Sequence, residues 1–182
     1  MPYLKIRVDE IREQGLTLSA QEQIADYPAL LAVQKAGECQ FLAPLEISLT
    51  VIREYDHIRA TGEVGTSVRL ACSRCLAVYD AAISSAFTIF YTKASAAVQL
   101  DEEVELAEHD LVSATYAGDE IDFSPEIAEQ VALEIPFKPL CNEVCRGLCA
   151  VCGVDLNATT CGCEKQETSL KFNALQGYKV DR

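Results

Sequence analysis

Six of the nine cysteines in this 182-residue chain lie within 23 residues, from Cys141 to Cys163. Glycines and polar residues separate them, and few bulky apolar side chains accompany them. Such a segment cannot build a hydrophobic core of its own, but its thiolates can wrap a metal ion. We therefore expect the C-terminal part to be an arm that is held together by cross-links. The cross-links are either metal or disulfide bonds, because the cysteine patterns of the two overlap.

The spacing within this segment favours tetrahedral zinc. In Cys149-Ala-Val-Cys152-Gly, two thiolates two residues apart can face one ion, and Gly153 lets the backbone turn beneath it. Another pair returns after eight intervening residues, whose glycine, aspartate and asparagine suit a tight loop. We therefore predict a closed structural zinc site with the ligands Cys149, Cys152, Cys161 and Cys163.

A second cysteine pair, Cys72-Ser-Arg-Cys75, lies between two strand-like runs. At a hairpin tip it is half a metal site, a redox pair or two small turn residues. A thioredoxin-like redox pair would stand at a helix N-terminus, whereas the sequence after Cys75 is strand-like. Three arrangements stay open: Cys141 and Cys145 join the hairpin pair on a second ion, they compete for the tail ion, or the hairpin pair acts alone. Cys39, isolated before a strand, is predicted to be a small core or edge residue.

The remaining sequence predicts an α+β protein. We expect a twisted or barrel-like antiparallel sheet, a few short helices and a C-terminal cysteine-rich zinc-binding arm. Alternating apolar residues predict strands at 4–8, 44–55, 57–72 and 76–92, with a polar stretch running through residue 23. Short polar turns between the three long runs favour an antiparallel meander, because parallel pairing needs a long crossover. We assign residues 1–137 to the α+β body and 138–182 to the metal-binding tail.

Two helices are expected, one between Asp26 and Gly37 and one from Ser124 to Pro136. Asp26 and Ser124 are the predicted N-caps, and each is followed by a proline that suits the first helical turn. Gly37 and Pro136 are expected to end the two helices. Apolar residues on one face of the second helix predict that it packs on the sheet. The chain runs from the end of this helix directly into the cysteine cluster.

The net charge of −13 is unevenly distributed. Residues 1–137 carry nine Lys or Arg against 23 Asp or Glu, whereas residues 138–182 carry six against five. Because an acidic body repels phosphate, any nucleic-acid contact is expected on the near-neutral tail or on local basic spots. The candidate phosphate contacts are Arg74, Lys138, Arg146, Lys165 and Lys171. The acidic stretch at 101–110 is expected to be a solvated loop or a docking surface for a basic partner.

No catalytic motif is recognised in the sequence, so an enzyme is not expected. His57 and His109 are the only histidines, and neither has a serine or cysteine in a known nucleophile context. Gly62 and Gly65 lack the strand-to-helix context of a phosphate-binding loop and are expected to allow a bend or bulge. Charges interrupt every apolar run near the start of the sequence. We find neither a signal peptide nor a membrane-spanning segment there, and we expect a cytoplasmic protein.

Two separated motifs resemble the YceD-like family. One is Cys72-Ser-Arg-Cys75-Leu, and the other is the helix that runs through Pro136 into Gly-Leu-Cys149-Ala-Val-Cys152-Gly-Val-Asp-Leu-Asn. The family is described as a domain of unknown function and as large ribosomal RNA subunit accumulation proteins, and the likeness spans residues 40–175. It implies a bacterial and plastid protein, without established catalytic activity, linked to accumulation or processing of large-subunit ribosomal RNA. One branch of the family lacks the tail cysteines, so tail zinc is expected to stabilise the arm.

Two classes of function follow. The first is a non-catalytic ribosome-biogenesis factor that docks on large-subunit ribosomal RNA or a precursor ribosome through the hairpin and tail. The second is a zinc-stabilised interaction module whose acidic body binds a basic partner such as a ribosomal protein. Binding to large-subunit RNA and to basic ribosomal proteins across a salt series separates the two classes.

Overall fold

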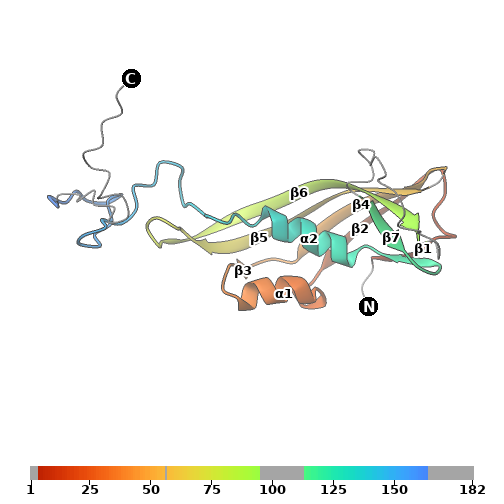
Figure 1. Cartoon of the computed structure of the whole chain (residues 1–182), viewed down its shortest axis with the longest axis horizontal. Coiled ribbons are helices and arrows are strands. Elements are labelled where there is room, and N and C mark those ends of the chain that lie inside the picture. Colours follow the sequence, from red (N-terminus) through yellow and green to blue (C-terminus); the bar gives the residue numbers. More distant parts are fainter. Residues whose placement is uncertain (1–3, 56, 95–112, 164–182) are drawn as a thin grey trace, which may run out of the picture.

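The computed structural model describes residues 4–55, 57–94 and 113–163. Its main layer is a six-stranded sheet in the order β2-β4-β5-β6-β7, with β3 also paired to β5. The strands are β2 (Leu16–Glu22), β3 (Gln40–Phe41), β4 (Leu45–Arg53), β5 (Ile58–Ala71), β6 (Val78–Lys93) and β7 (Ser113–Tyr116). Within the described residues this order has two free ends, so the sheet is open and curved rather than a closed barrel (Figure 1). The predicted α+β class with a mainly antiparallel sheet is confirmed.

The three long predicted strands correspond to β4, β5 and β6, which form the expected antiparallel meander. Strands β2, β3 and β7 of this sheet were not predicted. β2 lies in the supposed polar stretch and pairs along β4 from Leu16 to Glu22. Its inward residues end in Ala20 and Glu22 after Leu16 and Leu18, so its apolar face is short. β7 pairs with β6 in parallel, so the sheet is mixed at that edge.

A second, two-stranded sheet pairs the two ends of the described body. It joins β1 (Lys5–Arg7) to β8 (Glu120–Asp122) in antiparallel register. β1 lies within the predicted strand at 4–8, so that prediction is confirmed. The pairing places the start of the chain beside the segment that leads into the second helix.

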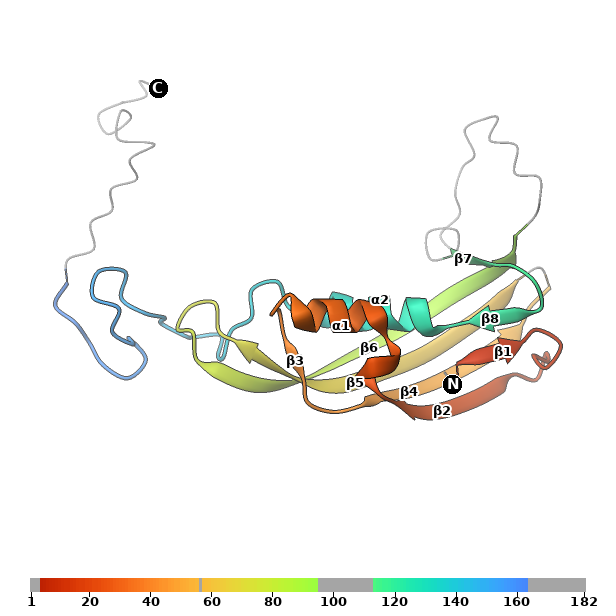
Figure 2. The ribbon, with the colours of Figure 1, turned by 90° about the horizontal axis from the view of Figure 1, so that it is seen from below.

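The helices are α1 (Pro28–Lys35) and α2 (Ser124–Glu134), which cover one face of the sheet (Figure 2). The predicted N-caps Asp26 and Ser124 are wrong, because the cap positions are Tyr27 and Phe123. Asp26 belongs to a preceding 3-10 turn, and the N–H of Ser124 donates to the carboxylate of Asp122 at 3.0 Å. The predicted end of α1 is confirmed, since Gly37 follows the C-cap with a φ of 81°.

The main core lies between the sheet and the two helices. Alternate residues of β4 are buried beneath the helices: Leu45, Ile47, Leu49 and Val51. Their neighbours Glu46 and Ser48 face the opposite, exposed side, as expected for an antiparallel sheet with one solvated face. Ile127 and Val131 of α2 close the core from the helical side, which confirms that α2 packs on the sheet.

The expected bend or bulge at Gly62 and Gly65 is not found. Strand β5 pairs without interruption through both residues with β4 and β6. A Cβ atom on Gly62 would lie 2.8 Å from the carbonyl oxygen of Ser48 and 3.0 Å from the ring of Phe87. Gly62 therefore allows the aromatic ring to pack directly against the strand.

Beyond the β5–β6 hairpin, residues 138–163 continue as an arm without helix or strand elements of its own (Figure 1). The division of the chain at residue 137 stays a prediction. Among the helices of the described part, none is long and apolar enough to cross a membrane.

Candidate metal centres

The first candidate centre begins at the tip of the β5–β6 hairpin. The N–H of Leu76 donates to the carbonyl of Cys72 at 2.9 Å, and the N–H of Cys72 donates to the carbonyl of Ala77 at 2.9 Å. The turn also directs the N–H of Arg74 at the Cys72 sulfur, at 3.4 Å. Leu76 has a φ of 61°, so the turn has a left-handed backbone at a residue that carries a side chain. This geometry places both hairpin thiols on one side of the tip.

The chain that leaves α2 returns to this tip. The N–H of Ser73 donates to the carbonyl of Pro139 at 2.8 Å, which brings the next two cysteines to the hairpin pair. The Sγ atoms of Cys72, Cys75, Cys141 and Cys145, here called the clamp tetrad, all lie within 4.8 Å of one another. The Sγ atoms of Cys72 and Cys145 are 3.8 Å apart, and those of Cys75 and Cys141 are 3.6 Å apart. A tetrahedron with Zn–S bonds of about 2.3 Å has S–S edges of about 3.8 Å, so the clamp tetrad is positioned to hold a metal ion.

The second candidate centre lies farther along the arm. The Sγ atoms of Cys149, Cys152, Cys161 and Cys163, the tail tetrad, also lie within 4.8 Å of one another. Its turn resembles the hairpin tip, because the N–H of Val151 points at the Cys149 sulfur at 3.5 Å and Gly153 donates to the Cys149 carbonyl at 2.8 Å. Gly153 has a φ of 73°, where glycine avoids the strain of a side chain. The tail tetrad is likewise positioned to hold a metal ion.

One thiol in each tetrad has a lowered pKa. The backbone N–H of Cys141, with those of Cys75 and Arg74, lowers the pKa of Cys72 to about 6. The backbone N–H groups of Cys152 and Val151 lower the pKa of Cys149 to about 6. Hydrogen bonds to a thiolate favour its charged form, and the thiolate is the form that binds metal.

Other thiols in the tetrads show the opposite shift. Hydrogen bonding with the sulfur of Cys75 is the main cause that raises the pKa of Cys141 to about 12. Hydrogen bonding with Cys152 does the same for Cys163, also to about 12. Four sulfurs this close cannot all be negative unless a cation neutralises them. The donor set thus fits a soft-ligand divalent cation, and four thiolates at tetrahedral spacing are compatible with zinc.

Acid is expected to release metal from both tetrads. As pH falls through about 6, Cys72 and Cys149 gain protons and metal must compete with them for the sulfur. Equilibrium dialysis followed by elemental analysis should show full loading near about pH 8 and a steep fall below about pH 6. A metal content that is flat from about pH 8 to about pH 5 would contradict thiolate ligation.

The candidate phosphate contacts have different surroundings. The guanidinium of Arg74 is occupied within the clamp, where Nη1 donates to the carbonyls of Cys145 at 2.8 Å and Glu143 at 3.4 Å. Lys138 and Arg146 are exposed on the arm. Lys165 and Lys171 lie outside the described residues, as does the acidic stretch at 101–110.

Two other singled-out residues lie away from both tetrads. Cys39 is buried with Val68 and Leu70 in a small apolar cluster, so the core alternative applies to it. His57 contacts the carboxylate of Glu54 at 2.6 Å near the β4–β5 turn. His109 lies outside the described residues.

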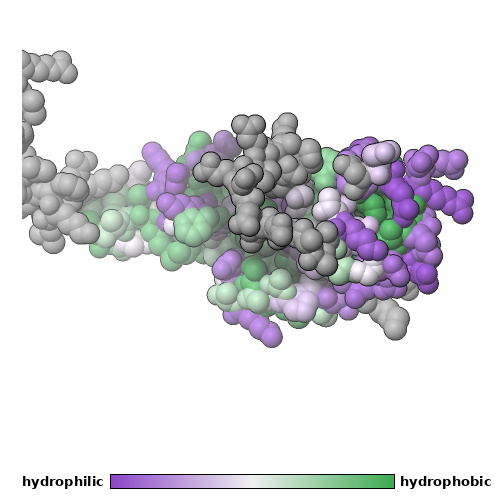
Figure 3. All heavy atoms as spheres, turned by 45° about the vertical axis from the view of Figure 1, so that its right-hand side comes forward, coloured by the Kyte–Doolittle hydropathy of each residue, from purple (hydrophilic) through white to green (hydrophobic). Residues whose placement is uncertain are grey.

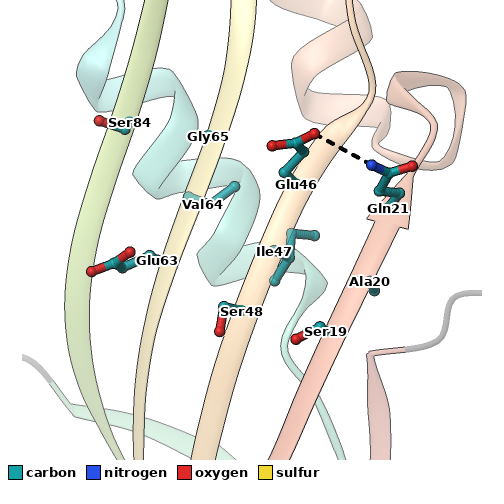
Figure 4. Close-up of a pocket in the computed structure, with 10 residues that line it drawn as sticks. All are labelled: Ser19, Ala20, Gln21, Glu46, Ile47, Ser48, Glu63, Val64, Gly65 and Ser84. Atoms are coloured by element: carbon teal, nitrogen blue, oxygen red, sulfur yellow. Dashed lines mark hydrogen bonds between the residues drawn. The ribbon is translucent and has the colours of Figure 1, made fainter.

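A polar hollow of about 580 Å³ lies on the exposed face of the sheet (Figure 4). Its lining includes the hydroxyls of Ser19, Ser48 and Ser84 and the carboxylates of Glu46 and Glu63. No cysteine or histidine is among its described lining residues. The hollow results from short side chains on a solvated sheet face, and sequence alternation alone gives no sign of its depth.

A family model and two plant relatives with the same family description match much of the chain. The family model described as "Large ribosomal RNA subunit accumulation protein YceD" matches residues 60–179, which include both tetrads. A protein of Arabidopsis thaliana named "Large ribosomal RNA subunit accumulation protein YCED homolog 1, chloroplastic" is 26% identical over 200 residues, covering 94% of this chain and 56% of the relative. Its namesake in Zea mays is 29% identical over 143 residues, covering 66% of this chain and 49% of the relative.

A bacterial relative matches a shorter stretch at a higher identity. An uncharacterized protein of Mycobacterium tuberculosis is 32% identical over 115 residues, which cover 63% of this chain and 52% of the relative. The chain thus spans about half the length of the curated relatives it matches. No solved structure matches the chain.

Proposed function

The chain belongs to the YceD family of large ribosomal RNA subunit accumulation proteins, and from this membership we propose that it is a non-catalytic factor in assembly of the large ribosomal subunit. It supports the accumulation or processing of large-subunit ribosomal RNA. The observation that carries the proposal is the family match over residues 60–179, which spans both tetrads. We propose that the protein acts in the cytoplasm, although the plant relatives are named chloroplastic.

In this proposal both tetrads bind zinc, and the ions have a structural role. Zinc at the clamp tetrad cross-links the hairpin to the arm, and zinc at the tail tetrad orders the loop that follows. The arm then presents Lys138 and Arg146, both exposed, to phosphates of large-subunit RNA. Arg74, also exposed, helps to hold the arm in place, because its Nη1 donates to the carbonyls of Glu143 and Cys145.

A second candidate function, binding of a ribosomal protein, is favoured by exposed apolar side chains. Eight large apolar residues are exposed in the described part of the chain, and six of them belong to the hairpin, the end of α2 or the arm: Leu76, Val78, Leu133, Phe137, Val144 and Val151. Figure 3 shows hydrophobic surface at this end of the molecule. Apolar side chains suit contact with protein better than contact with phosphate. The acidic body would add attraction for a basic protein.

The proposed function is tested by removing the gene from its host. Large-subunit ribosomal RNA is expected to fall relative to small-subunit RNA, and the wild-type chain should restore it. A Cys72→Ser/Cys145→Ser chain, which lacks the clamp tetrad, is expected not to restore it, whereas Cys39→Ser should. An unchanged RNA ratio in the deletion strain, across growth temperatures, would contradict the proposal.

The two modes of binding make different predictions for arm variants. Lys138→Glu/Arg146→Glu is expected to weaken binding to purified large-subunit RNA and to flatten its salt dependence, since each phosphate contact adds about −0.9 to the log–log slope on duplex. Phe137→Ser/Val144→Ser should leave RNA binding intact but weaken binding to purified large-subunit proteins. Leu42→Ser, at an exposed apolar residue away from the arm, is the control for both. If the charge variant binds RNA like wild type, the RNA contact lies elsewhere.

A further inference from the structure

One side chain connects the two tetrads directly. Asn157 lies in the loop between Cys152 and Cys161 of the tail tetrad, yet its Nδ2 donates to the Sγ of Cys145, a member of the clamp tetrad, at 3.4 Å. Its Oδ1 accepts the N–H of Arg146 at 2.7 Å. A residue in the loop of one centre therefore holds the sulfur and the following backbone of the other.

The Asn157 amide is fixed in this orientation by its own loop. Asp155 accepts both the Nδ2 of Asn157 at 2.8 Å and its backbone N–H at 2.9 Å. The backbone of Asp155 is fixed in turn, because it bridges to Leu148 and accepts the hydroxyl of Thr159 at 3.2 Å. The amide thus reaches Cys145 from an ordered loop, and an ordered loop is what the tail tetrad needs for closure.

The short link between the tetrads is also tied on both sides. Only three residues, 146–148, separate Cys145 from Cys149. Toward the hairpin, the N–H of Leu148 donates to the carbonyl of Arg74 at 3.0 Å, and toward the tail loop, the carbonyl of Gly147 accepts the N–H of Leu156 at 2.9 Å. The link cannot move freely once either centre is formed.

We infer that the clamp and tail tetrads form a cooperative pair of metal sites, in which an ion at one raises the affinity of the other, with Asn157 as the linking residue. This inference rests on the zinc binding proposed above. An N–H···S bond is strongest to an ionised sulfur, and Cys145 is held as a thiolate when the clamp tetrad is loaded. A loaded clamp therefore strengthens the bond to Asn157, and the tail loop is ordered before its own ion binds.

The alternative is a pair of independent centres on one arm, with Asn157 serving only as a loop residue. The two differ in a measurable way, because linkage between sites is reciprocal. Under cooperative binding, removing ligands of the clamp tetrad lowers the zinc affinity of the tail tetrad. Removing ligands of the tail tetrad lowers the zinc affinity of the clamp tetrad by the same factor. Independent centres keep their affinities when the neighbour is blocked.

The test uses the full chain, reduced and stripped of metal, titrated with zinc alone against a chromophoric chelator. Tail affinity is measured in wild type and in Cys72→Ser/Cys75→Ser, and clamp affinity in wild type and in Cys149→Ser/Cys152→Ser. Each affinity is expected to fall about tenfold or more when the neighbour is blocked, within the range typical of linked sites. Cobalt(II) spectra of the same chains report whether the remaining site keeps four sulfur ligands.

A separate set of variants tests the linking role of Asn157. Asn157→Ala is expected to bind two ions but to lose most of the linkage factor. Thr160→Ala is the control, since Thr160 is exposed in the same loop and takes no part in the bonds that fix Asn157, and it should keep the factor. Equal affinities in the blocked and wild-type chains, or a full linkage factor in Asn157→Ala, would overturn the inference while leaving the zinc proposal intact. A chain that binds no zinc would overturn both.

Discussion

Replacing Cys72 and Cys145 by serine is expected to release one ion per chain and to detach residues 138–163 from the hairpin, while the sheet stays folded. The arm buries little of its own surface, and only Cys145, Gly147 and Cys149 are buried within it. A structural zinc contributes about 10–16 kcal/mol of binding free energy in small zinc-dependent folds, far more than the few backbone bonds that otherwise hold the arm. Limited proteolysis should therefore cut the arm rapidly in this variant, with circular dichroism of the sheet unchanged.

The control for this experiment is Cys39→Ser. Cys39 is also buried, but it packs against Val68 and Leu70, away from both tetrads. This variant should keep two ions per chain and a protected arm, although its stability falls modestly. If the Cys72→Ser/Cys145→Ser chain kept both ions, or if its arm resisted protease like wild type, the clamp tetrad would have no structural role.

Gly147→Ala is expected to lower the zinc affinity of the clamp tetrad about 100-fold. A Cβ atom at this position would lie 2.9 Å from the carbonyl oxygen of Arg74, and the residue has a φ of 75°. The left-handed backbone alone costs about 1–2 kcal/mol for a residue with a side chain. The hairpin backbone must also move away, which breaks the contact between Leu148 and Arg74. Zinc affinity measured by chelator competition tests this expectation.

Gly118 provides a matched control for the backbone cost. Its φ of 79° is nearly the same, but an added Cβ would meet nothing within 4 Å. Gly118→Ala should therefore lose about 1–2 kcal/mol of stability in denaturant unfolding and keep wild-type zinc affinity. If the two substitutions changed the zinc affinity equally, the close approach of Gly147 to the hairpin would not matter for the metal centres.

The local parts of the candidate site could be predicted from sequence, because they depend on near neighbours. The Cys149 and Cys152 pair, with its following glycine, identifies a turn that can face one ion, and the tail tetrad contains the four predicted residues. The sequence left three arrangements open for Cys141 and Cys145, and their partners at the hairpin tip could not be chosen from sequence alone. They depend on where α2 ends relative to a hairpin 66 to 73 residues earlier, which only the packed sheet determines.

Other features had weaker signals. Asn157 ends the Gly-Leu-Cys149-Ala-Val-Cys152-Gly-Val-Asp-Leu-Asn motif, but the motif gives no sign that its amide reaches Cys145, because that bond depends on how the loop folds over the link. Arg74 stays a predicted phosphate contact, and its charge in the sequence gives no sign that its Nη1 also donates to carbonyls of the arm. Strand β2 was missed since only two of its inward residues, Leu16 and Leu18, are large and apolar.

We propose that both tetrads hold zinc and that the clamp tetrad fastens the arm to the sheet. Elemental analysis combined with zinc X-ray absorption, on protein prepared without chelator, measures both the number of ions and their ligands. Two zinc ions per chain are expected, each with four sulfur ligands at about 2.3 Å. One zinc ion per chain, oxygen or nitrogen ligands in place of sulfur, or cysteines oxidised in pairs without metal would contradict the proposal.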